Sequence, residues 1–157
     1  MVSSGECATT IYIDADACPV KEEVYRVAAR YALPVVLVAN ARMRVPEGSA
    51  VKLVLVAGGQ LDSADDWIAE RAREGDIVVT ADIPLASRCV SAGARVLDPR
   101  GRVYTEESVG DALATRNLMS QLREVGAVTG GPAPHAKRDR SLFLQKLDEL
   151  VQQVRRR

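Results

Sequence analysis

Five short apolar runs rich in Val and Ile constrain the fold of this chain more than any other feature. They lie in the first hundred residues, and segments with helical periodicity separate most of them. Strands that are covered on both faces read as continuous apolar runs, so the pattern predicts a mostly parallel sheet with helices on both faces, a three-layer α/β/α fold. The predicted strands are residues 9–13, 34–39, 51–56, 76–80 and 94–97.

Helices are predicted between these strands and after the last one. A stripe of apolar residues from Val20 to Tyr31 predicts a first helix that opens near Pro19. The other expected helices run from Asp62 or Ser63 to Arg73, from Pro84 to just before Gly93, over 109–122 as one helix or two, and from a cap at Asp139 or Ser141 to the end. Residues 126–138 read as the longest loop. We therefore expect one domain over residues 9–155, with a helical segment from about 105 and a disordered segment 1–8.

Composition removes several classes of function. The chain has 157 residues, of which 47% are apolar, and its 21 basic and 21 acidic side chains leave no net charge to attract a polyanion. Three cysteines without a CxxC pair and a single histidine argue against a zinc site. No apolar stretch reaches the roughly 18 residues of a membrane span. These observations predict a cytoplasmic protein with no membrane partner, and they leave its oligomeric state open.

Acidic residues follow four of the five predicted strands. Open α/β sheets bind ligands beyond the carboxyl ends of their strands, so these acids are expected at one edge of the sheet. Carboxylates crowded in this way repel one another unless a cation neutralises them, and oxygen ligands without histidine favour Mg²⁺ or Mn²⁺. The acids concerned are Asp14, Asp16, Asp62, Asp65, Asp66, Asp82 and Asp98.

Each acid also has a structural explanation. Asp62 is a good helix cap, Asp98 suits a turn before Pro99, and Asp16 would cap a helix opening at Pro19. Asp65 and Asp66 would favour the positive end of their helix. Cys18 is better explained as a small buried side chain than as a nucleophile, because no histidine is near it in sequence. Trp67 is expected to pack its helix onto the sheet.

Other phosphate chemistries match the sequence less well. The Asp-x-Asp stretch at Asp14 resembles the signature of haloacid-dehalogenase-type phosphatases, in which the first Asp attacks phosphorus. That family also needs a lysine at a strand end and a Gly-Asp after a later strand, whereas Gly75-Asp76 precedes a strand here. No GxGxxG follows the first strand, and no P-loop is present.

The remaining pattern is an Asp at the end of the first strand, acids on a mid-chain helix, and Thr80-Ala81-Asp82 before the next helix. It is similar to the metal-dependent nuclease sites of PIN-like domains, where "TAD" before a helix recurs. Longer stretches over about residues 10–150 resemble the YaiI/YqxD family of bacterial proteins, which is functionally uncharacterised. They read "YIDADACPVK", "GGQLDSADDWIAE", "GDIVVTADIPLA", "TRNLMSQLRE" and "GGPAPHAKRDRSLFLQKLDEL". One departure is Pro134-His135-Ala136, where relatives commonly read Pro-Phe-Ser.

The leading hypothesis is a Mg²⁺- or Mn²⁺-dependent nuclease that acts on RNA or single-stranded nucleic acid. Asp14 and Asp82 would bind a metal, Asp65 or Asp66 a second metal or a bridging water, and Asp16 would orient them. Substrate phosphates would be held by Asn40, Arg42, Thr80, Lys137 and Arg140. The alternatives are a non-catalytic nucleic-acid or protein binding module with a degenerate acidic site, and a small-molecule phosphohydrolase.

Overall fold

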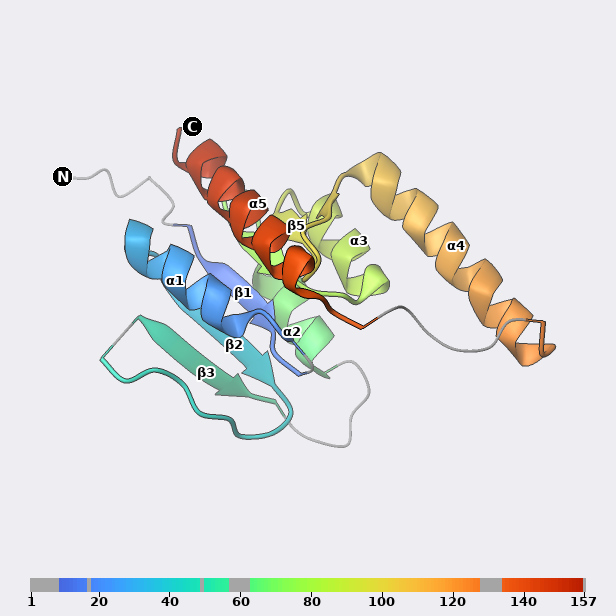
Figure 1. Ribbon diagram of the computed structural model, residues 1–157, viewed down its shortest axis with the longest axis horizontal. Coiled ribbons are helices and arrows are strands. Elements are labelled where there is room, and N and C mark those ends of the chain that lie inside the picture. Colours follow the sequence, from blue (N-terminus) through green and yellow to red (C-terminus); the bar gives the residue numbers. More distant parts are fainter. Residues whose placement is uncertain (1–8, 17, 49, 57–62, 128–133, 157) are drawn as a thin grey trace.

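A computed structural model of the chain describes residues 9–16, 18–48, 50–56, 63–127 and 134–156 (Figure 1). In this part of the chain, six strands form one sheet in the order β3-β2-β1-β4-β5-β6. Strands β1 to β5 are parallel to their neighbours, and β6 is antiparallel to β5. The strands are β1 (Ile11–Asp14), β2 (Val35–Ala39), β3 (Val51–Leu55), β4 (Ile77–Val79), β5 (Arg95–Leu97) and β6 (Val103–Tyr104). All five predicted strands are confirmed, whereas β6 was not predicted.

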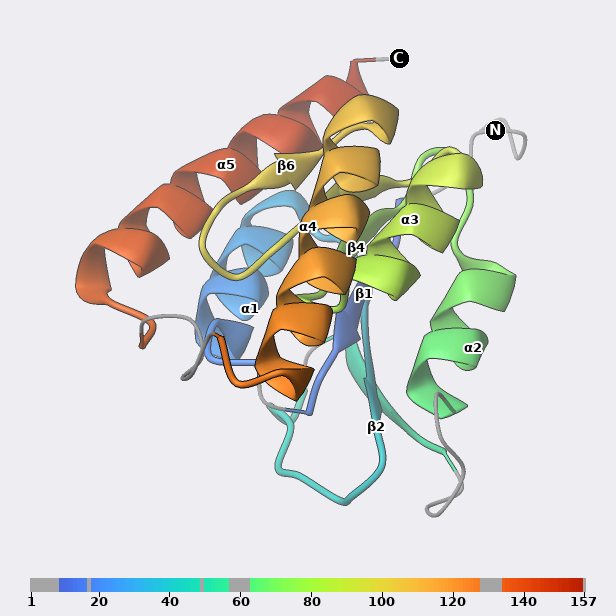
Figure 2. The same cartoon turned by 90° about the vertical axis from the view of Figure 1, so that its right-hand side faces the viewer.

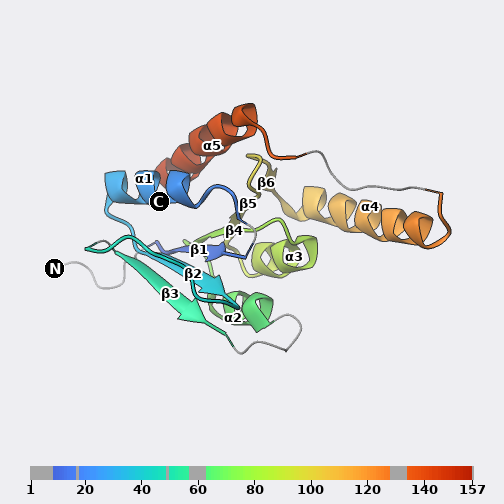
Figure 3. The ribbon, with the colours of Figure 1, turned by 60° about the horizontal axis from the view of Figure 1, so that its bottom comes forward.

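Helices cover both faces of the sheet, so the predicted three-layer α/β/α fold is confirmed. Figure 2 shows α1 and α5 on one side of the sheet and α2 and α3 on the other. Helix α4 follows β6, packs against α3, and extends outward from the body (Figures 1 and 3). The helices are α1 (Lys21–Tyr31), α2 (Ser63–Arg71), α3 (Ile83–Ser91), α4 (Glu106–Glu124) and α5 (Lys137–Arg155).

Two apolar clusters hold the layers together. The first lies between the sheet and the α1/α5 layer, and Phe143 and Leu147 of α5 are fully buried in it with Ile11 and Ile13 of β1. The second lies on the opposite face and includes Ile68 of α2, together with residues of α3 and α4. Trp67 packs edge-on against Tyr12 of β1, with ring centroids 6.1 Å apart. Its predicted role, to fasten a helix to the sheet, is confirmed.

Two predicted helix starts are wrong. Helix α1 begins at Lys21, with Val20 as its N-cap, so Pro19 lies before the helix and Asp16 does not cap it. Helix α5 begins at Lys137, with Ala136 at the N-cap position, and neither Asp139 nor Ser141 is the cap. Instead, Asp139 is the third helical residue, and its carboxylate accepts the backbone N–H of Ala136 at 2.8 Å. An acid in the first turn can therefore satisfy a free N–H from inside the helix.

Some predictions fall on residues outside the described part of the chain. These are the disordered segment 1–8, the cap at Asp62 and residues 128–133 of the predicted loop. Among the described residues, no helix is long and apolar enough to cross a membrane.

Replacing Asp148 with Asn should destabilise the fold, because this carboxylate joins α5 to α1. It accepts hydrogen bonds from Tyr31 at 2.5 Å and from Gln152 at 2.7 Å, and it pairs with Arg30. Hydrogen bonds to a charged group contribute about 2 kcal/mol, so urea unfolding should show a loss of about that size. The matched control is Glu149→Gln on the exposed side of α5, where the contacts of this carboxylate with Lys146 and Gln145 should together contribute less than about 1 kcal/mol. Equal losses in both variants would contradict this assignment.

Candidate functional site

The two central strands of the sheet bring the main candidate residues together. Strand β1 pairs with both β2 and β4. From β1, the strands β2 and β3 follow on one side and β4, β5 and β6 on the other, so the strand order reverses between β1 and β4. In such a sheet the point where the strand order reverses is the usual ligand-binding crevice. Asp14 is the last residue of β1, and Thr80 directly follows β4. The predicted convergence of the first and fourth strand ends is therefore confirmed.

A cavity of about 260 Å³ lies at this point. Three of its lining residues are acids, and we call it the acidic pocket. It is lined by Asp14, Asp16, Cys18, Val79, Thr80, Ala81, Asp82 and Pro99.

A chain of hydrogen bonds connects the two strand ends. The Thr80 hydroxyl donates to Asp14 Oδ2 at 3.0 Å and accepts the backbone N–H of Asp82, also at 3.0 Å. Asp82 in turn caps α3, because its Oδ1 accepts the N–H of Leu85 at 2.9 Å. Thr80 is almost fully buried, at 2% exposure. Thr80 is thus a fixed link between Asp14 and Asp82. Asp82, two residues after Thr80, both caps α3 and lines the acidic pocket.

Asp16 reaches the neighbouring strand end. Its Oδ2 accepts both the backbone N–H and the side-chain amide of Asn40, each at 3.0 Å. The parallel register explains the contact, because Asp14 lies opposite Val38 and Asp16 therefore lies level with Asn40. Asn40 positions an acid in this structure, and its predicted contact with substrate stays a prediction.

The acidic pocket raises the pKa of Asp14 above its ordinary value. Burial is the largest cause, and the nearby carboxylates of Asp82 and Asp16 act in the same direction. The hydrogen bond from Thr80 opposes them, because it stabilises the ionised form. A carboxylate that is held ionised at such a site is destabilised by its surroundings, and a bound cation would relieve that cost.

Cys18 does not have the surroundings of a nucleophile. It is free and only 7% exposed, and burial raises the pKa of its thiol. The predicted role as a small buried side chain is confirmed. The loop that carries it is held from α1 by Lys21, whose Nζ donates to the carbonyls of Ala15 at 3.2 Å and of Cys18 at 2.8 Å.

The acids of α2 are not part of the acidic pocket. The Asp66 carboxylate accepts a hydrogen bond from Arg88 of α3 at 2.7 Å, in an exposed ion pair. Asp65 is also in the first turn of α2 and does not line the cavity. Of the predicted set Asp14, Asp66 and Asp82, Asp66 therefore does not line the acidic pocket. Asp98 is not gathered there either, because its Oδ1 accepts the N–H groups of Arg100 and Arg102 in a turn.

The basic residues predicted to hold phosphates lie in different environments. Arg140 donates to the carbonyl of Pro19 at 2.9 Å and lies 3.7 Å from Glu23, so its guanidinium is already engaged by protein groups. Arg42 and Lys137 are exposed, and neither has an ion-pair partner within the described residues. Those two side chains remain available to an anion.

The donor atoms of the acidic pocket fit a hard divalent cation only in part. Asp14, Asp16 and Asp82 each have one carboxylate oxygen with no hydrogen-bond partner in the described part of the chain. However, no group of three or more His, Cys, Asp or Glu side chains among the described residues could hold a metal ion. Mg²⁺ is commonly bound by one or two carboxylates together with substrate phosphates, so two acids fit a site that substrate completes.

Two features of the site were not predicted from the sequence. Pro99 lines the cavity from the turn after β5, and Lys21 holds the loop after β1. The available signal for Pro99 was its position at a strand end beside β4. No sequence signal distinguishes Lys21 from other first-turn lysines.

Comparison with known sequences assigns the family. A sequence model described as "Uncharacterized BCR, YaiI/YqxD family" matches residues 12–153, which include every residue of the acidic pocket. The chain belongs to the YaiI/YqxD family. The resemblance noted in its sequence motifs is thereby confirmed.

Curated members of the YaiI/YqxD family are similar over nearly their whole length. A UPF0178 protein of Bradyrhizobium diazoefficiens is 58% identical over 149 residues, covering 95% of this chain and 89% of that protein. One of Rhodopseudomonas palustris is 57% identical over 152 residues, covering 97% and 96%. One of Brucella ovis is 57% identical over 147 residues, covering 93% and 91%. No solved structure matches this chain.

Proposed function

We propose that the acidic pocket is the site of a Mg²⁺- or Mn²⁺-dependent phosphodiesterase that cleaves RNA or single-stranded nucleic acid. The observation that carries the proposal is the placement of Asp14. It is a half-buried carboxylate at the reversal point of the sheet, fixed by Thr80 and joined through it to Asp82. A half-buried carboxylate beside two others lowers the stability of the fold, and a bound cation would offset that loss.

Each pocket residue has a distinct task in this proposal. Asp14 and Asp82 would hold the cation with their free oxygens, while Thr80 keeps the two strand ends in register. Asp16, fixed by Asn40, would accept a hydrogen bond from a bound water. When bound, the cation supplies a lowered pKa for its water and neutralises charge on a phosphate oxygen.

A nucleic-acid substrate is supported by two exposed basic side chains and by the size of the acidic pocket. Arg42 and Lys137 are exposed basic side chains without ion-pair partners among the described residues, and either can contact a phosphate. The cavity is smaller than the roughly 300–1,000 Å³ of typical small-molecule sites, which favours one phosphate group of a chain over a whole small molecule. We place the activity in the cytoplasm, because Cys18 and Cys89 are free thiols.

A non-catalytic binding module is the second candidate. It is favoured by the absence of a three-ligand group among the described residues and by the use of Asp82 Oδ1 as a helix cap. In that case the acidic pocket would bind a partner without cutting it.

Calorimetric titration with Mn²⁺ tests the proposed site. We expect saturable binding at or below about 1 mM in the wild-type protein, because two carboxylates bind such ions weakly without substrate. Asp82→Asn should abolish the heat, whereas Asp66→Asn, which removes an acid outside the acidic pocket, should leave it unchanged. The proposal fails if the wild-type protein binds no Mn²⁺ at millimolar concentration with a nucleotide monophosphate present, or if Asp66→Asn is the variant that loses binding.

A further inference from the structure

The first turn of α5 contacts two loops that each contribute a wall residue to the acidic pocket. One wall contains Cys18, in the loop between β1 and α1, and the other contains Pro99, in the turn between β5 and β6. Asp139 and Arg140 are consecutive residues of the helix, and each side chain reaches a different one of these loops. The two loops are far apart in sequence, and this turn of helix connects them.

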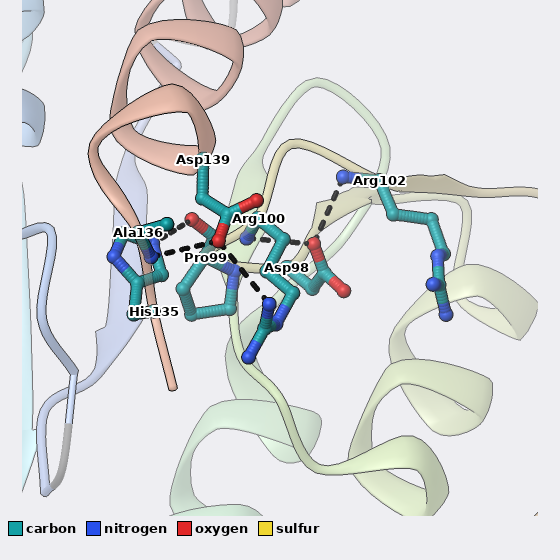
Figure 4. Close-up of polar contacts among 7 residues, drawn as sticks. All are labelled: Asp98, Pro99, Arg100, Arg102, His135, Ala136 and Asp139. Carbon is teal, nitrogen blue, oxygen red and sulfur yellow. Dashed lines mark hydrogen bonds and ion pairs between the residues drawn. The ribbon is translucent and has the colours of Figure 1, made fainter. Parts of the chain in front are cut away.

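On the Pro99 side, two polar contacts join the turn to the start of α5 (Figure 4). His135 Nε2 donates to the Pro99 carbonyl at 2.7 Å, because a carbonyl can only accept. The Asp139 carboxylate accepts from Arg100 Nη1 at 3.2 Å and, at 2.8 Å, from the N–H of Ala136. The backbone N–H of Ala136 and the Arg100 guanidinium keep the pKa of Asp139 below its usual value. The dipeptide Pro99-Arg100 is thus held at two points.

Close backbone packing fixes the same turn to α5. Gly101 has a φ of +93°, and a Cβ at this position would lie 2.8 Å from Leu142 Cγ and 3.0 Å from the backbone N of Phe143. The turn therefore lies directly against the helix, with no room for a side chain between them. Phe143 itself is fully buried in the core, so the helix cannot easily move away.

On the Cys18 side, Arg140 is the connection. Its Nη1 donates to the carbonyl of Pro19 at 2.9 Å and lies 3.7 Å from Glu23 Oε2. The Glu23 side chain is only 14% exposed, and its Oε1 is buried with no hydrogen-bond partner among the described residues. Without the positive charge of Arg140, this carboxylate would be left poorly compensated, so the contact constrains both side chains.

We propose that His135, Asp139 and Arg140 form a clamp, the α5 clamp, that sets the separation of the two walls of the acidic pocket. These are positioning residues: they act through Pro19 and Pro99 and touch none of the three pocket acids. Their effect on cleavage rests on the proposed function, whereas their effect on the geometry of the pocket does not. The α5 clamp gives the segment from His135 to Arg140 a role in addition to packing.

Alkylation of Cys18 measures the opening of the acidic pocket directly. Iodoacetamide labelling at pH 8, resolved by peptide mass spectrometry, reports Cys18 in the pocket wall and the fully buried Cys89 as an internal reference. In Arg140→Ala we expect Cys18 labelling to accelerate about tenfold, as for the loss of one or two hydrogen bonds, with Cys89 unchanged. Arg140→Lys, which retains the charge and a donor, should restore part of the protection.

Arg138→Ala is the matched control, since Arg138 is an exposed arginine in the same turn and has no ion-pair partner among the described residues. It should label Cys18 at the wild-type rate. The α5 clamp is refuted if folded Arg140→Ala labels Cys18 at the wild-type rate, or if Cys18 and Cys89 accelerate together, which is the sign of a merely structural role. This readout needs neither metal nor substrate. It can therefore succeed where the phosphodiesterase proposal fails.

Discussion

The Asp14→Asn variant should lose metal-dependent cleavage by about a thousandfold, because a metal ligand contributes several kcal/mol of transition-state stabilisation. The substitution keeps the shape of the side chain, and the Asn oxygen can still accept the hydrogen bond from Thr80. The measurement is single-turnover cleavage of a labelled single-stranded RNA with Mn²⁺. Asp66→Asn, purified in parallel, should retain wild-type activity, whereas activity from a contaminating nuclease would persist in Asp14→Asn as well. Equal activity in Asp14→Asn and the wild-type protein would rule out catalysis at the acidic pocket.

The same variant should be at least as stable as the wild-type protein. The pKa of Asp14 is raised in the folded state, so the ionised carboxylate lowers the free energy of unfolding at neutral pH. That penalty is present above the folded-state pKa. It disappears as the pH falls toward the ordinary Asp value of about 3.9. The melting temperature of Asp14→Asn should therefore equal or exceed that of the metal-free wild-type protein at pH 7, and the difference should close below about pH 4. A lower melting temperature at pH 7 would contradict this account.

The Gly101→Ala variant should lose about 3 kcal/mol or more of unfolding free energy. Two costs add at this position. A non-glycine residue at a φ of +93° is strained, and its Cβ would lie 2.8 to 3.0 Å from Leu142 and Phe143. Because the atoms in contact include the backbone of α5, they cannot move aside as a flexible side chain would. Urea unfolding gives the loss, and Cys18 labelling should accelerate if the helix is displaced.

Gly75 offers a matched control for the strain alone. Its φ is +96°, and a Cβ there would meet no atom within 4 Å. Gly75→Ala should therefore cost only the conformational strain, about 1–2 kcal/mol. The difference between the two variants measures the close approach of the β5–β6 turn to α5. If both variants lose the same free energy, that approach is looser than the structure indicates.

The sequence predicted the strands well because each one is a nearly continuous apolar run. Strand β6 could not be predicted in this way, because Val103–Tyr104 is too short to show any periodicity. It forms through pairing with Val96 and Leu97 of β5. The start of α5 was misplaced for a different reason. An acid is favoured both at the N-cap and within the first turn, so Asp139 alone cannot fix the boundary.

The candidate site was predictable as far as it follows from strand ends. Asp14, Thr80 and Asp82 come together because β1 and β4 are parallel neighbours, which is a property of the topology. The contact between Asp16 and Asn40 could not be predicted without the register of β1 against β2. The ion pair of Asp66 with Arg88 could not be predicted without the packing of α2 against α3. The engagement of Arg140 by Pro19 joins residues 121 positions apart, and no local pattern contains that information.

The order of strands also determines when the acidic pocket can form during folding. Asp14 and its partner Thr80 are 66 residues apart, so their contact requires the closure of a long loop and the insertion of β4 beside β1. A partly folded molecule containing only β1, α1, β2 and β3 holds Asp14 and Asp16 but has neither Thr80 nor Asp82 in place. We therefore expect incompletely folded chains to carry no phosphodiesterase site, since that site would be assembled only when the sheet is nearly complete.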